Sequence, residues 1–539
     1  MDFKVSHIPF AQTNAVNALV TDYYTGNKNL ETYYAFEPNL NGINEAIEKR
    51  TNTAPNRKLL HHALQKQYSN LPTHNEVKSN LSSLLNSQTF TVTTGHQLNL
   101  FTGPLYFIYK IASAIKLAQI LNQQYSDKHF VPVYWMASED HDFDEINHTY
   151  VFDKKINWTE TNKGATGSLP ITNIDNCLTQ LKEALGANVF ANEIINLISI
   201  AYQNKKNLAE ATRALVNELF GQNGLVIIDA SDKTLKQLFI PYLKADIFDS
   251  LAYKNVDDTT KQLSKKYKTQ VFARPINLFY MIDGIRERIE SEGDNYRVLN
   301  TTISFNKTEI EHEIESNPER FSPNVILRPV YQEVLLPNVA YIGGGAEVSY
   351  WLQYKKMFDA YNIFYPVVLL RNSFLWIEKS IDKKINQLKL PIVDLFLDKT
   401  TLVKRFLLQD DTISKFALPA NHQIELVYNQ LATAISNIDT TLLATAQSEK
   451  QKALNGIKIL EDKALKAIKR KNETALLQID TIKENLFPMQ SLQERYFNFT
   501  MFYCKHGKTF IETILQNTLP IANSFTVITE TDAKPTIVQ

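Results

Sequence analysis

Short apolar runs alternate with helical patterns in the first part of the chain. A β-branched run at 90–94 ends at Gly95, and apolar residues at helical spacing follow over 105–121. The next apolar run, 130–136, stops at a very acidic stretch. A strand, a helix and a strand in so short a span predict a βαβ unit, and therefore a parallel sheet with a right-handed crossover.

The same pattern of strand and helix returns later in the chain. Residues 224–229 are a continuous apolar run that ends at an aspartate, which predicts a buried strand. Residues 340–342 run into three glycines, a helical pattern follows over 347–361, and 364–370 again has strand character. The predicted fold class is therefore α/β with a parallel-sheet core. Asp283-Gly284, flanked by apolar runs, predicts a β-hairpin between these segments.

The region 423–485 differs in composition and in the spacing of its apolar residues. It contains one glycine and no proline, and its apolar residues recur at steps of three and four. A repeat sustained over this length predicts a coiled coil, either within the chain or between subunits. Its polar face is rich in lysine, and we expect a helix over 374–388 to be its antiparallel partner.

Composition narrows the class of protein. The 539 residues exceed the size of a single core, so at least two structural units are expected. Lys plus Arg equals Asp plus Glu at 57 each, which argues against a surface built as a whole to attract nucleic acid. Cys177 and Cys504 are too few and too far apart for a disulfide framework or a cysteine zinc site. Neither a signal peptide nor a long apolar span is evident, so we expect a cytoplasmic protein without a membrane segment.

The first candidate site is the loop at 94–104, between the first predicted strand and its helix. Open α/β sheets bind ligands at this position. Glycines let the backbone approach a ligand, and the helix start offers unpaired N–H groups to an anion. His96 is the candidate catalytic residue here, because it can stabilise a phosphate or carboxylate; the alternative is a tight turn with a packed histidine. The predicted binding residues of the loop are Gly95, Gln97, Asn99, Thr102 and Gly103.

The second candidate is the acidic loop at 138–145, directly after the second strand. Five carboxylates surround His141, and their repulsion raises some of their pKa values unless a cation relieves it. Such a loop can hold Mg²⁺, bind a substrate amine or supply a general base through His141. The alternative is N-capping of a helix by Asp142 or Asp144. The predicted catalytic residues are Asp140 and His141, with Glu139 and Asp142 binding substrate and Asp140 and Asp142 holding a metal if one is bound.

The third candidate is the glycine run before the 347–361 helix. Three glycines in a row are explained most simply by close approach of a ligand or by left-handed backbone. A carboxylate at Glu347 would favour the helix start through its dipole. Arg328, upstream, can point to the same site or be paired structurally. The predicted binding residues are Arg328, Gly343, Gly344, Gly345 and Glu347. The phosphate loop GxxxxGK[ST] and the motifs GxGxxG, HExxH and GxSxG are all absent from the sequence.

Five stretches, taken in order, resemble the cysteine ligase family of bacillithiol synthesis (BshC). They are TGHQLNLFTGPLYFIYK, YWMASEDHDFDEI, NLFYMIDGIRERI, FSPNVILRPVYQEVLLPNVAYIGGGAEVSYW and LFPMQSLQERYFNF. The resemblance covers nearly the whole chain. It implies a Rossmann-like core with connecting insertions, a C-terminal helical coiled coil and a homodimer. It also implies the reaction that joins the carboxyl of L-cysteine to the amino group of glucosaminyl-malate, the last step of bacillithiol biosynthesis.

The means of activating the carboxylate stays open at this stage. A carboxylate does not acylate an amine in water unaided, so an acyl-adenylate or acyl-phosphate made with ATP and Mg²⁺ is one route, and a Rossmann-like core suits a nucleotide. Two rival functions stay open as well. One is a synthetase-like protein that binds tRNA through the lysine-rich coiled coil, and the other is a non-catalytic coiled-coil scaffold. The scaffold gives no reason for glycine and acidic loops at three strand ends.

With this resemblance the chain divides into six predicted parts. They are an N-terminal helical part of the core (1–88), a first Rossmann-like half (89–149), connecting insertions with a further core strand near 224–229 (150–320), a second Rossmann-like half (321–372), a helical coiled-coil domain (373–490) and a C-terminal segment that packs back on the core (491–539).

Overall fold

The computed structural model describes residues 2–51, 55–203, 205–408 and 414–531. The remaining positions of the predicted helical, insertion, coiled-coil and C-terminal parts lie outside the described residues. The chain forms two compact units. The larger unit comprises Val5–Leu375 and Glu494–Val527, and the smaller comprises Trp376–Gln493 with short segments at the two chain ends.

A five-stranded sheet forms the centre of the larger unit. Its strands are β2 (Thr89–His96), β3 (His129–Met136), β6 (Val226–Asp229), β12 (Asn338–Gly343) and β13 (Val367–Leu370). Their order is β13-β12-β2-β3-β6, and every neighbouring pair is parallel. The chain adds β3 and β6 on one side of β2 and then returns to add β12 on the other side. The order in which the chain adds strands therefore reverses between β2 and β12, and this position is the switch point of the sheet. The predicted Rossmann-like α/β fold is confirmed.

The N-terminal region is mostly helical, with one correction to the prediction. The chain begins with a strand, β1 (Asp2–Pro9), which pairs with β15 (Ser524–Thr531) in a three-stranded sheet. Its sequence DFKVSHIP alternates apolar and polar residues over too few positions to show a helical period. The helices that follow are α1 (Ala18–Tyr24), α2 (Leu40–Thr51), α3 (Arg57–Tyr68) and α4 (Asn75–Ser83).

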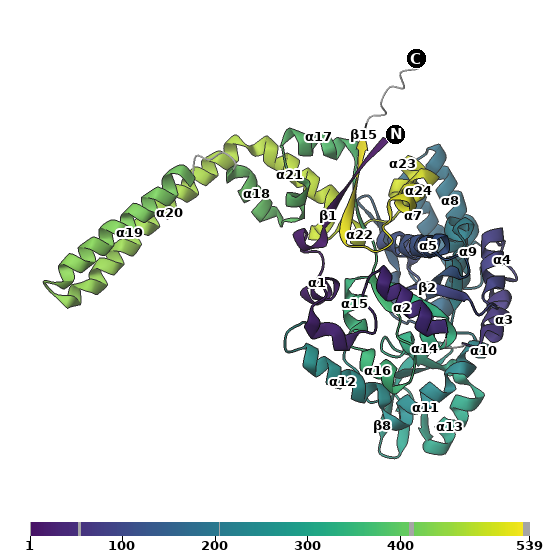
Figure 1. Ribbon diagram of the computed structural model, residues 1–539. Helices are drawn as coiled ribbons and strands as arrows, with labels where there is room; N and C mark the ends of the chain where they lie inside the picture. Colours follow the sequence, from purple (N-terminus) through teal and green to yellow (C-terminus); the bar gives the residue numbers. More distant parts are fainter. Residues whose placement is uncertain (1, 52–54, 204, 409–413, 532–539) are drawn as a thin grey trace. The chain divides into compact units, whose positions relative to one another are not determined.

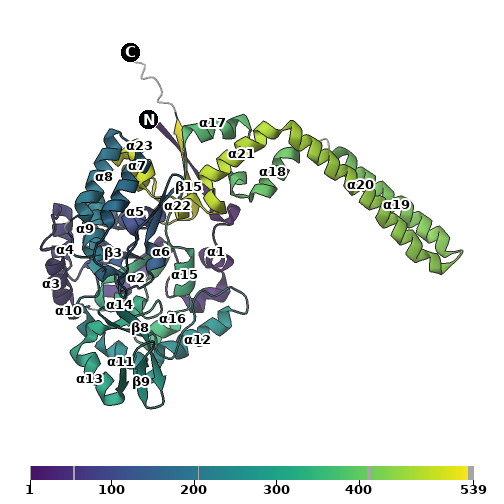
Figure 2. The same ribbon diagram turned by 180° about the vertical axis from the view of Figure 1, so that it is seen from behind.

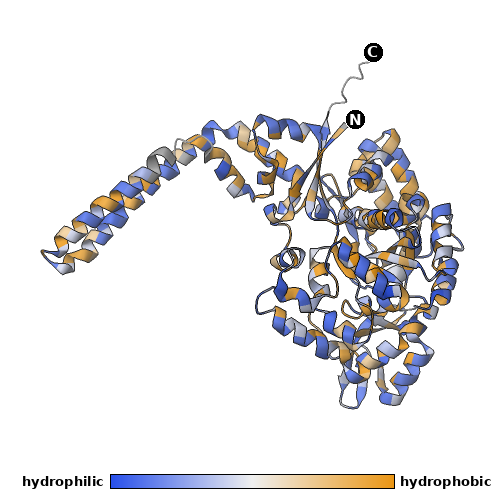
Figure 3. Cartoon of the chain, viewed as in Figure 1, coloured by the Kyte–Doolittle hydropathy of each residue, from blue (hydrophilic) through white to orange (hydrophobic). Residues whose placement is uncertain are grey.

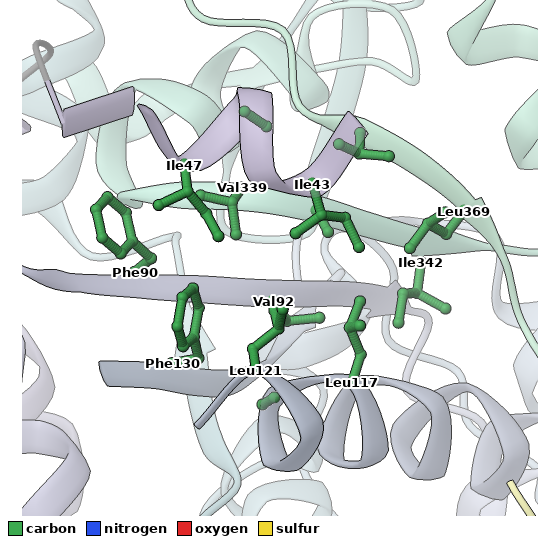
Figure 4. Packing of buried hydrophobic residues seen from close by; sticks show 14 of the residues in the cluster. Ile43, Ile47, Phe90, Val92, Leu117, Leu121, Phe130, Val339, Ile342 and Leu369 are labelled. Atoms are coloured by element: carbon green, nitrogen blue, oxygen red, sulfur yellow. The ribbon is translucent and has the colours of Figure 1, made fainter. Parts of the chain in front are cut away.

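Helix α5 (Tyr106–Gln124) and helix α2 pack against the strands to form a buried core cluster. Phe90 and Val92 of β2 are two residues apart, so their side chains point to the same side of the sheet. Leu117 and Leu121, one turn apart on α5, meet them in the same cluster (Figure 4). Burial of each such side chain contributes about 1.5–3 kcal/mol, which anchors the strand whose end enters the site.

The insertions contain the predicted hairpin. β7 (Leu278–Ile282) pairs antiparallel with β8 (Ile285–Glu292), Ile282 faces Ile285, and Gly284 has a φ of +73°. The hairpin prediction is therefore confirmed. The other elements here are β4 (His148–Val151), β5 (Lys154–Asn157), α6 (Phe143–Ile146), α7 (Ile174–Leu185), α8 (Val189–Tyr202), α9 (Leu208–Phe220), α10 (Lys233–Lys236), α11 (Ile240–Asp249), α12 (Leu251–Leu263), β9 (Asn295–Val298), β10 (Ser304–Asn306), α13 (Lys307–Ser316) and β11 (Phe321–Pro323).

The single helix predicted over 347–361 is in fact two helices. They are α15 (Gly345–Trp351) and α16 (Lys355–Ala360), and both follow α14 (Arg328–Leu335) in the chain. The break coincides with Gln353, a fully buried residue. Its side-chain oxygen accepts from the backbone N–H of Gln270 at 3.0 Å, and its amide group donates to the Thr260 hydroxyl at 2.7 Å. The apolar spacing predicts that the helix continues through this position, but these tertiary hydrogen bonds hold Gln353 in the break between the two helices.

The end of the chain returns to the larger unit. Helix α23 (Thr500–His506) lies beside α8, and α24 (Lys508–Asn517) packs on α5; both views show α23 next to α8 (Figure 1 and Figure 2). The short helix α22 (Gln493–Tyr496) precedes them. This return brings residues near 494–498 to the sheet.

The smaller unit contains a helical hairpin. Helices α19 (Ser414–Ser436) and α20 (Leu443–Lys471) run side by side and are joined by a turn that includes Thr440–Leu442 (Figure 1). Apolar and polar residues alternate along both helices (Figure 3). The coiled-coil prediction is confirmed by this pairing.

The predicted partner of the coiled coil is right for its last helix and wrong for the rest. Residues 374–377 belong to a strand, β14 (Ser373–Ile377), because the apolar and aromatic run Phe374–Ile377 favours β-structure. The helix that follows, α17 (Lys379–Gln387), packs on α21 (Glu473–Leu486). The partner of α20 is α19, since Asp439 caps the turn and breaks the apolar seam into two helices. In the sequence, helix α18 (Lys399–Leu408) lies between α17 and α19. Within the described residues, none of the helices has the length and apolar content needed to cross a bilayer.

Candidate active site

A cavity of about 550 Å³ lies at the carboxyl ends of the parallel strands. Each of the five strands sends residues to its wall. They are Gly95 at the end of β2, Met136 at the end of β3, Ala230 after β6, Gly344 after β12 and Arg371 after β13. Open α/β sheets bind ligands in this position, at the point where the strand order reverses.

Ten of the predicted site residues line this cavity. They are Gly95, His96, Gln97, Glu139, Asp140, His141, Arg328, Gly344, Gly345 and Glu347. The tertiary structure therefore brings all three candidate loops and Arg328 together. The other five predicted residues, Asn99, Thr102, Gly103, Asp142 and Gly343, are not among its lining residues.

The far end of the first loop has a structural role. Phe101, Thr102 and Gly103 all have left-handed backbone, with φ values of 50°, 72° and 65°. The side-chain amide of Asn498, a fully buried residue, donates to the carbonyl oxygens of Phe101 at 2.9 Å and Gly103 at 2.6 Å. The Asn99 side chain turns away to donate to the carbonyl of Glu145 at 3.2 Å. These bonds fix the loop that positions the start of α5.

Asp142 and Gly343 also have structural explanations. Asp142 accepts a hydrogen bond from the N–H of Glu145 at 3.3 Å and caps α6, which is the alternative that the sequence left open. A Cβ at Gly343 would lie 2.7 Å from the Cβ of Glu347, so only glycine leaves room for the carboxylate. No group of three His, Cys, Asp or Glu side chains within the described ranges is placed to hold a metal ion.

The ion pair of Lys110 and Glu347 joins the two strands at the switch point. Lys110 Nζ lies 2.5 Å from Glu347 Oε2 and donates to the carbonyl oxygen of Gly95 at 2.7 Å. The N–H of Gly344 and the hydroxyl of Tyr341 donate to the same carboxylate at 2.8 Å and 2.6 Å. Burial lowers the pKa of Lys110 below its ordinary value, although Glu347 opposes the shift. Burial alone would raise the pKa of Glu347, but Lys110 and the backbone N–H hold it below its usual range.

Two arginines present unpaired N–H groups at this end of the cavity. Arg328 donates from Nη1 to the Gln332 side chain at 3.0 Å, while its buried Nη2 has no hydrogen-bond partner among the described residues. Arg371 is 4% exposed, and its Nη2 donates to Glu494 at 2.6 Å. The buried Nε of Arg371 is likewise without a partner in the described part of the chain, and it would lie 3.9 Å from a Cβ on Gly344. Two unpaired guanidinium N–H groups suit the oxygens of a carboxylate or phosphate.

His96 lies between the cations and the aromatic start of α5. Its ring packs on Tyr106 and Phe107 at 5.2 Å between centroids. Burial, together with the charges of Lys110 and Arg371, holds the pKa of His96 well below its ordinary value of 6.5. The imidazole is therefore neutral at pH 7, and its buried Nε2 makes no hydrogen bond within the described residues.

Neighbouring cations offset the charge repulsion between the carboxylates of the acidic loop. Glu139 lies 2.7 Å from the ammonium of Lys236, which is fully buried and donates to the carbonyl of Phe321. Asp140 accepts from Gln97 Nε2 at 2.7 Å and from the N–H of His141 at 2.7 Å. Burial alone would raise the pKa of Asp140, but the neighbouring His141 side chain, these hydrogen bonds and the charge of Arg286 bring it far below its ordinary value. Asp140 is thus ionised and a weak base.

The hairpin insertion completes the wall of the cavity. Arg286 of β8 reaches His141 with an Nη1–Nδ1 distance of 2.6 Å. Phe279 of β7 stacks under this guanidinium at 4.0 Å and lies 5.3 Å from the His141 ring. His141 is thereby held at the opening of the cavity, with 46% of its side chain exposed.

Sequence reasoning missed four cations that line the cavity. They are Lys110, Arg286, Arg371 and Arg495. With Arg328 they face three carboxylates, those of Glu139, Asp140 and Glu347, so the wall carries a net positive charge. A lysine on the apolar face of the 105–121 helix was a usable signal for Lys110, because such a residue is buried only when it is paired. No comparable signal marks the arginines, which reach the site from the hairpin, from the end of β13 and from α22.

The fold and this cavity define an α/β protein with a Rossmann-like core, a cavity at its switch point and a helical coiled coil. Residues 3–372 match the family model described as the N-terminal Rossmann-like domain of bacillithiol biosynthesis BshC. Residues 374–530 match the C-terminal coiled-coil domain of the same family. The chain belongs to the BshC family.

Curated relatives match over almost the whole chain. A protein of Flavobacterium johnsoniae is 41% identical and one of Flavobacterium psychrophilum is 40% identical; each match covers 97% of this chain, with 99% and 98% of the relatives. A protein of Bacillus cereus is 27% identical over 93% of this chain and 96% of its own length. All three carry the name "Putative cysteine ligase BshC".

Proposed function

We propose that this protein is a ligase of bacillithiol biosynthesis that joins the carboxyl of L-cysteine to the amino group of glucosaminyl-malate. The observation that carries the proposal is the net-cationic cavity at the switch point, with two unpaired guanidinium N–H groups in its wall. Carboxylates are the groups that such N–H donors bind best, and both proposed substrates carry them. The names of the relatives support the same reaction class.

The reaction requires an activated carboxyl, and we propose ATP with Mg²⁺ as the source of activation. Phosphate oxygens fit the same N–H donors as carboxylates do, and Lys110, Arg328 and Arg371 are the residues that would hold them. Of the two predicted metal ligands only Asp140 lines the cavity, so magnesium would be held mainly through phosphate. The same groups serve an acyl-adenylate and an acyl-phosphate.

Asp140 and His96 keep the roles in the reaction that the sequence suggested, and His141 remains one of the proposed catalytic residues. Asp140 is ionised at the edge of the cavity and suits the binding of the substrate amine as an ammonium ion. His96 is neutral, so it can accept or donate a hydrogen bond inside the cavity without adding charge. His141 stands at the opening, where the two substrates would meet.

The test is product formation by the purified full chain. The protein is mixed with cysteine and glucosaminyl-malate, with and without ATP and Mg²⁺, and bacillithiol is sought by mass spectrometry. We expect product only with ATP, loss of product in Arg328→Gln, and normal product in Arg297→Gln, whose side chain is 53% exposed on the hairpin. Absence of product from folded protein under both conditions would reject the proposed reaction.

A second function has one observation in its favour. Helix α20 carries eight basic residues against three acidic ones. The basic residues are Lys450, Lys452, Lys458, Lys463, Lys466, Lys469, Arg470 and Lys471. A synthetase-like protein would bind tRNA through this surface, with an affinity that falls steeply as salt rises. Salt-insensitive or absent tRNA binding leaves the ligase as the single candidate.

We also propose that the protein is a cytoplasmic homodimer. The helical hairpin exposes large apolar side chains, including Leu426, Leu431, Ile459 and Leu460, each at least 46% exposed. A second copy of the hairpin would cover such side chains. Light scattering of the full chain should give twice the mass of 61.7 kDa, and Leu460→Glu should shift it to the monomer.

A further inference from the structure

We propose that Arg286 fixes the protonation pattern of His141, so that His141 acts as a hydrogen-bond donor through Nε2 and not as a general base. Its use in acyl transfer rests on the proposed ligase function. The hydrogen-bond pattern itself follows from geometry alone. Arg286 is in this sense a positioning residue that acts through His141.

The short contact between the two side chains determines which nitrogen bears the proton. Arg286 Nη1 lies 2.6 Å from His141 Nδ1. A guanidinium offers donors only, so Nδ1 must accept. A neutral imidazole that accepts at Nδ1 carries its hydrogen on Nε2.

The guanidinium is held so firmly that it cannot turn away from the ring. Arg286 is 7% exposed, its Nε donates to the Ser322 hydroxyl at 3.1 Å, and its Nη2 donates to the carbonyl of Pro323 at 3.5 Å. Phe279 stacks against its face at 4.0 Å. Ser322 in turn donates to Glu139 at 3.1 Å, which ties the arrangement to the acidic loop. Every nitrogen of Arg286 therefore has a partner.

The carboxylate nearest to His141 does not compete for its ring proton. Asp140 Oδ1 is 3.7 Å from His141 Nδ1, beyond hydrogen-bond length, and it already accepts from the backbone N–H of His141 at 2.7 Å. The arrangement differs from the usual pair in which a carboxylate accepts from Nδ1–H and makes Nε2 a base. Here a cation takes the place of the carboxylate, and the role of Nε2 is reversed.

The location of the pair suits a group that acts between two substrates. His141 and Arg286 line the switch-point cavity and also a second cavity of about 560 Å³, formed with the loop at 160–164 and the tip of the hairpin. Within the described residues, none of the hydrogen bonds of His141 uses Nε2. This N–H is therefore available to a substrate oxygen.

In the amide-forming step, negative charge develops on the carbonyl oxygen of the acyl group, and this is the oxygen that Nε2–H would bind. The amine nitrogen bonds to the acyl carbon, and the bond from that carbon to a phosphate oxygen of the activated carboxyl breaks. The phosphate leaves with the electron pair. The ammonium ion of the substrate loses one proton before it attacks as the free amine and a second proton when the amide forms, and both protons pass to water. A nucleoside triphosphate supplies the phosphate. Loss of one donor to such an oxygen typically costs about 10²–10³ in rate.

The first test reads the position of the proton directly. ¹⁵N-histidine spectra of the full chain, with the His141 signals assigned by their loss in His141→Gln, should show Nε2 protonated and Nδ1 bare at pH 7. Arg286→Gln should mix the two tautomers, because glutamine can donate or accept, whereas Arg297→Gln on the neighbouring strand should change nothing. Nδ1 protonation in the wild-type protein would overturn the proposal.

The second test separates a donor from a base. His141→Gln keeps an N–H donor near the position of Nε2, and His141→Ala does not. We expect product formation to fall roughly 100-fold in His141→Ala and at most about tenfold in His141→Gln. Equal loss in both variants would show a base and reject the donor role. Inactivity of the wild-type protein would reject the ligase function instead, and the spectra would still decide the tautomer.

Discussion

Arg371 Nη2 lies 2.6 Å from Glu494 Oε1, which binds the residue after the last core strand to the segment that returns from the smaller unit. The two side chains are 5% and 1% exposed, so the pair is fully withdrawn from water. Glu494 is the only carboxylate in the described residues that forms an ion pair with Arg371 within 4.0 Å. The free Nε of the cavity arginine is therefore positioned by a residue 123 positions away in the chain.

Removal of Glu494 should destabilise the protein strongly. Glu494→Ala leaves a buried guanidinium without its counter-charge, which costs about 3–5 kcal/mol, and Glu494→Gln should fall between it and the wild type. The free energy of unfolding in urea measures the effect. Asp359→Ala is the matched control, because its ion pair with Lys355 at 2.6 Å is 61% exposed on the aspartate side and should cost less than about 1 kcal/mol. Equal losses in the two variants would contradict the assignment.

The glycines before α15 should differ in their tolerance of a methyl group. Gly343→Ala would bring a Cβ to 2.7 Å from Glu347 and should cost about 1–3 kcal/mol by overpacking. Gly345→Ala meets nothing within 4 Å and sits at a helix start, so its stability should be that of the wild type or slightly higher. Thermal unfolding of the two variants side by side is the measurement. A destabilised Gly345→Ala would show that this loop is tighter than its contacts indicate.

Asn498 should be essential to the loop that starts α5. In Asn498→Asp an acceptor replaces the donor that serves two carbonyl oxygens, while the oxygen that accepts from Thr500 is kept. Each buried carbonyl left without a donor costs about 1–3 kcal/mol. Hydrogen exchange of residues 99–105 should accelerate by the corresponding factor. Asn295→Asp on an exposed hairpin strand serves as the control and should leave exchange unchanged.

The buried carboxyl of Glu333 should make stability depend on pH. Burial raises its pKa from 4.5 to about 7, and its Oε1 accepts from Gln332 and Asn338. A raised pKa means that the folded protein holds a proton which the unfolded chain releases. The contribution to stability is therefore complete below pH 4.5 and is lost as pH rises toward 7, by about 1.4 kcal/mol per unit.

Glu333→Gln should remove this part of the pH dependence. The amide keeps an oxygen for Gln332 and Asn338 and carries no titrating proton. Urea midpoints at pH 5 and pH 7.5 should therefore differ less in the variant than in the wild type. The exposed Glu290→Gln is the control and should keep the wild-type difference. An unchanged difference in Glu333→Gln would assign the pH dependence to other groups.

The core strands were predictable because each is a run of apolar or β-branched residues between breaks in the pattern. The runs at 90–94 and 130–136 appear as β2 and β3 with a residue or two added at the ends. The N-terminal strand, the two helices in 347–361 and the partner of the coiled coil were not predictable in the same way. Tertiary hydrogen bonds decide the helix break, as the buried Gln353 amide shows.

The sequence by itself determined the α/β class, the hairpin at Asp283-Gly284, the coiled coil and the three loops at strand ends. Local periodicity, turn chemistry and family motifs carry that information. Only the tertiary structure decided which loop residues face the cavity, because a loop of ten residues has no period that assigns inward and outward positions. It also brought in Arg286, Arg371 and Arg495, since the chain folds distant segments onto one sheet edge and their charges act through space.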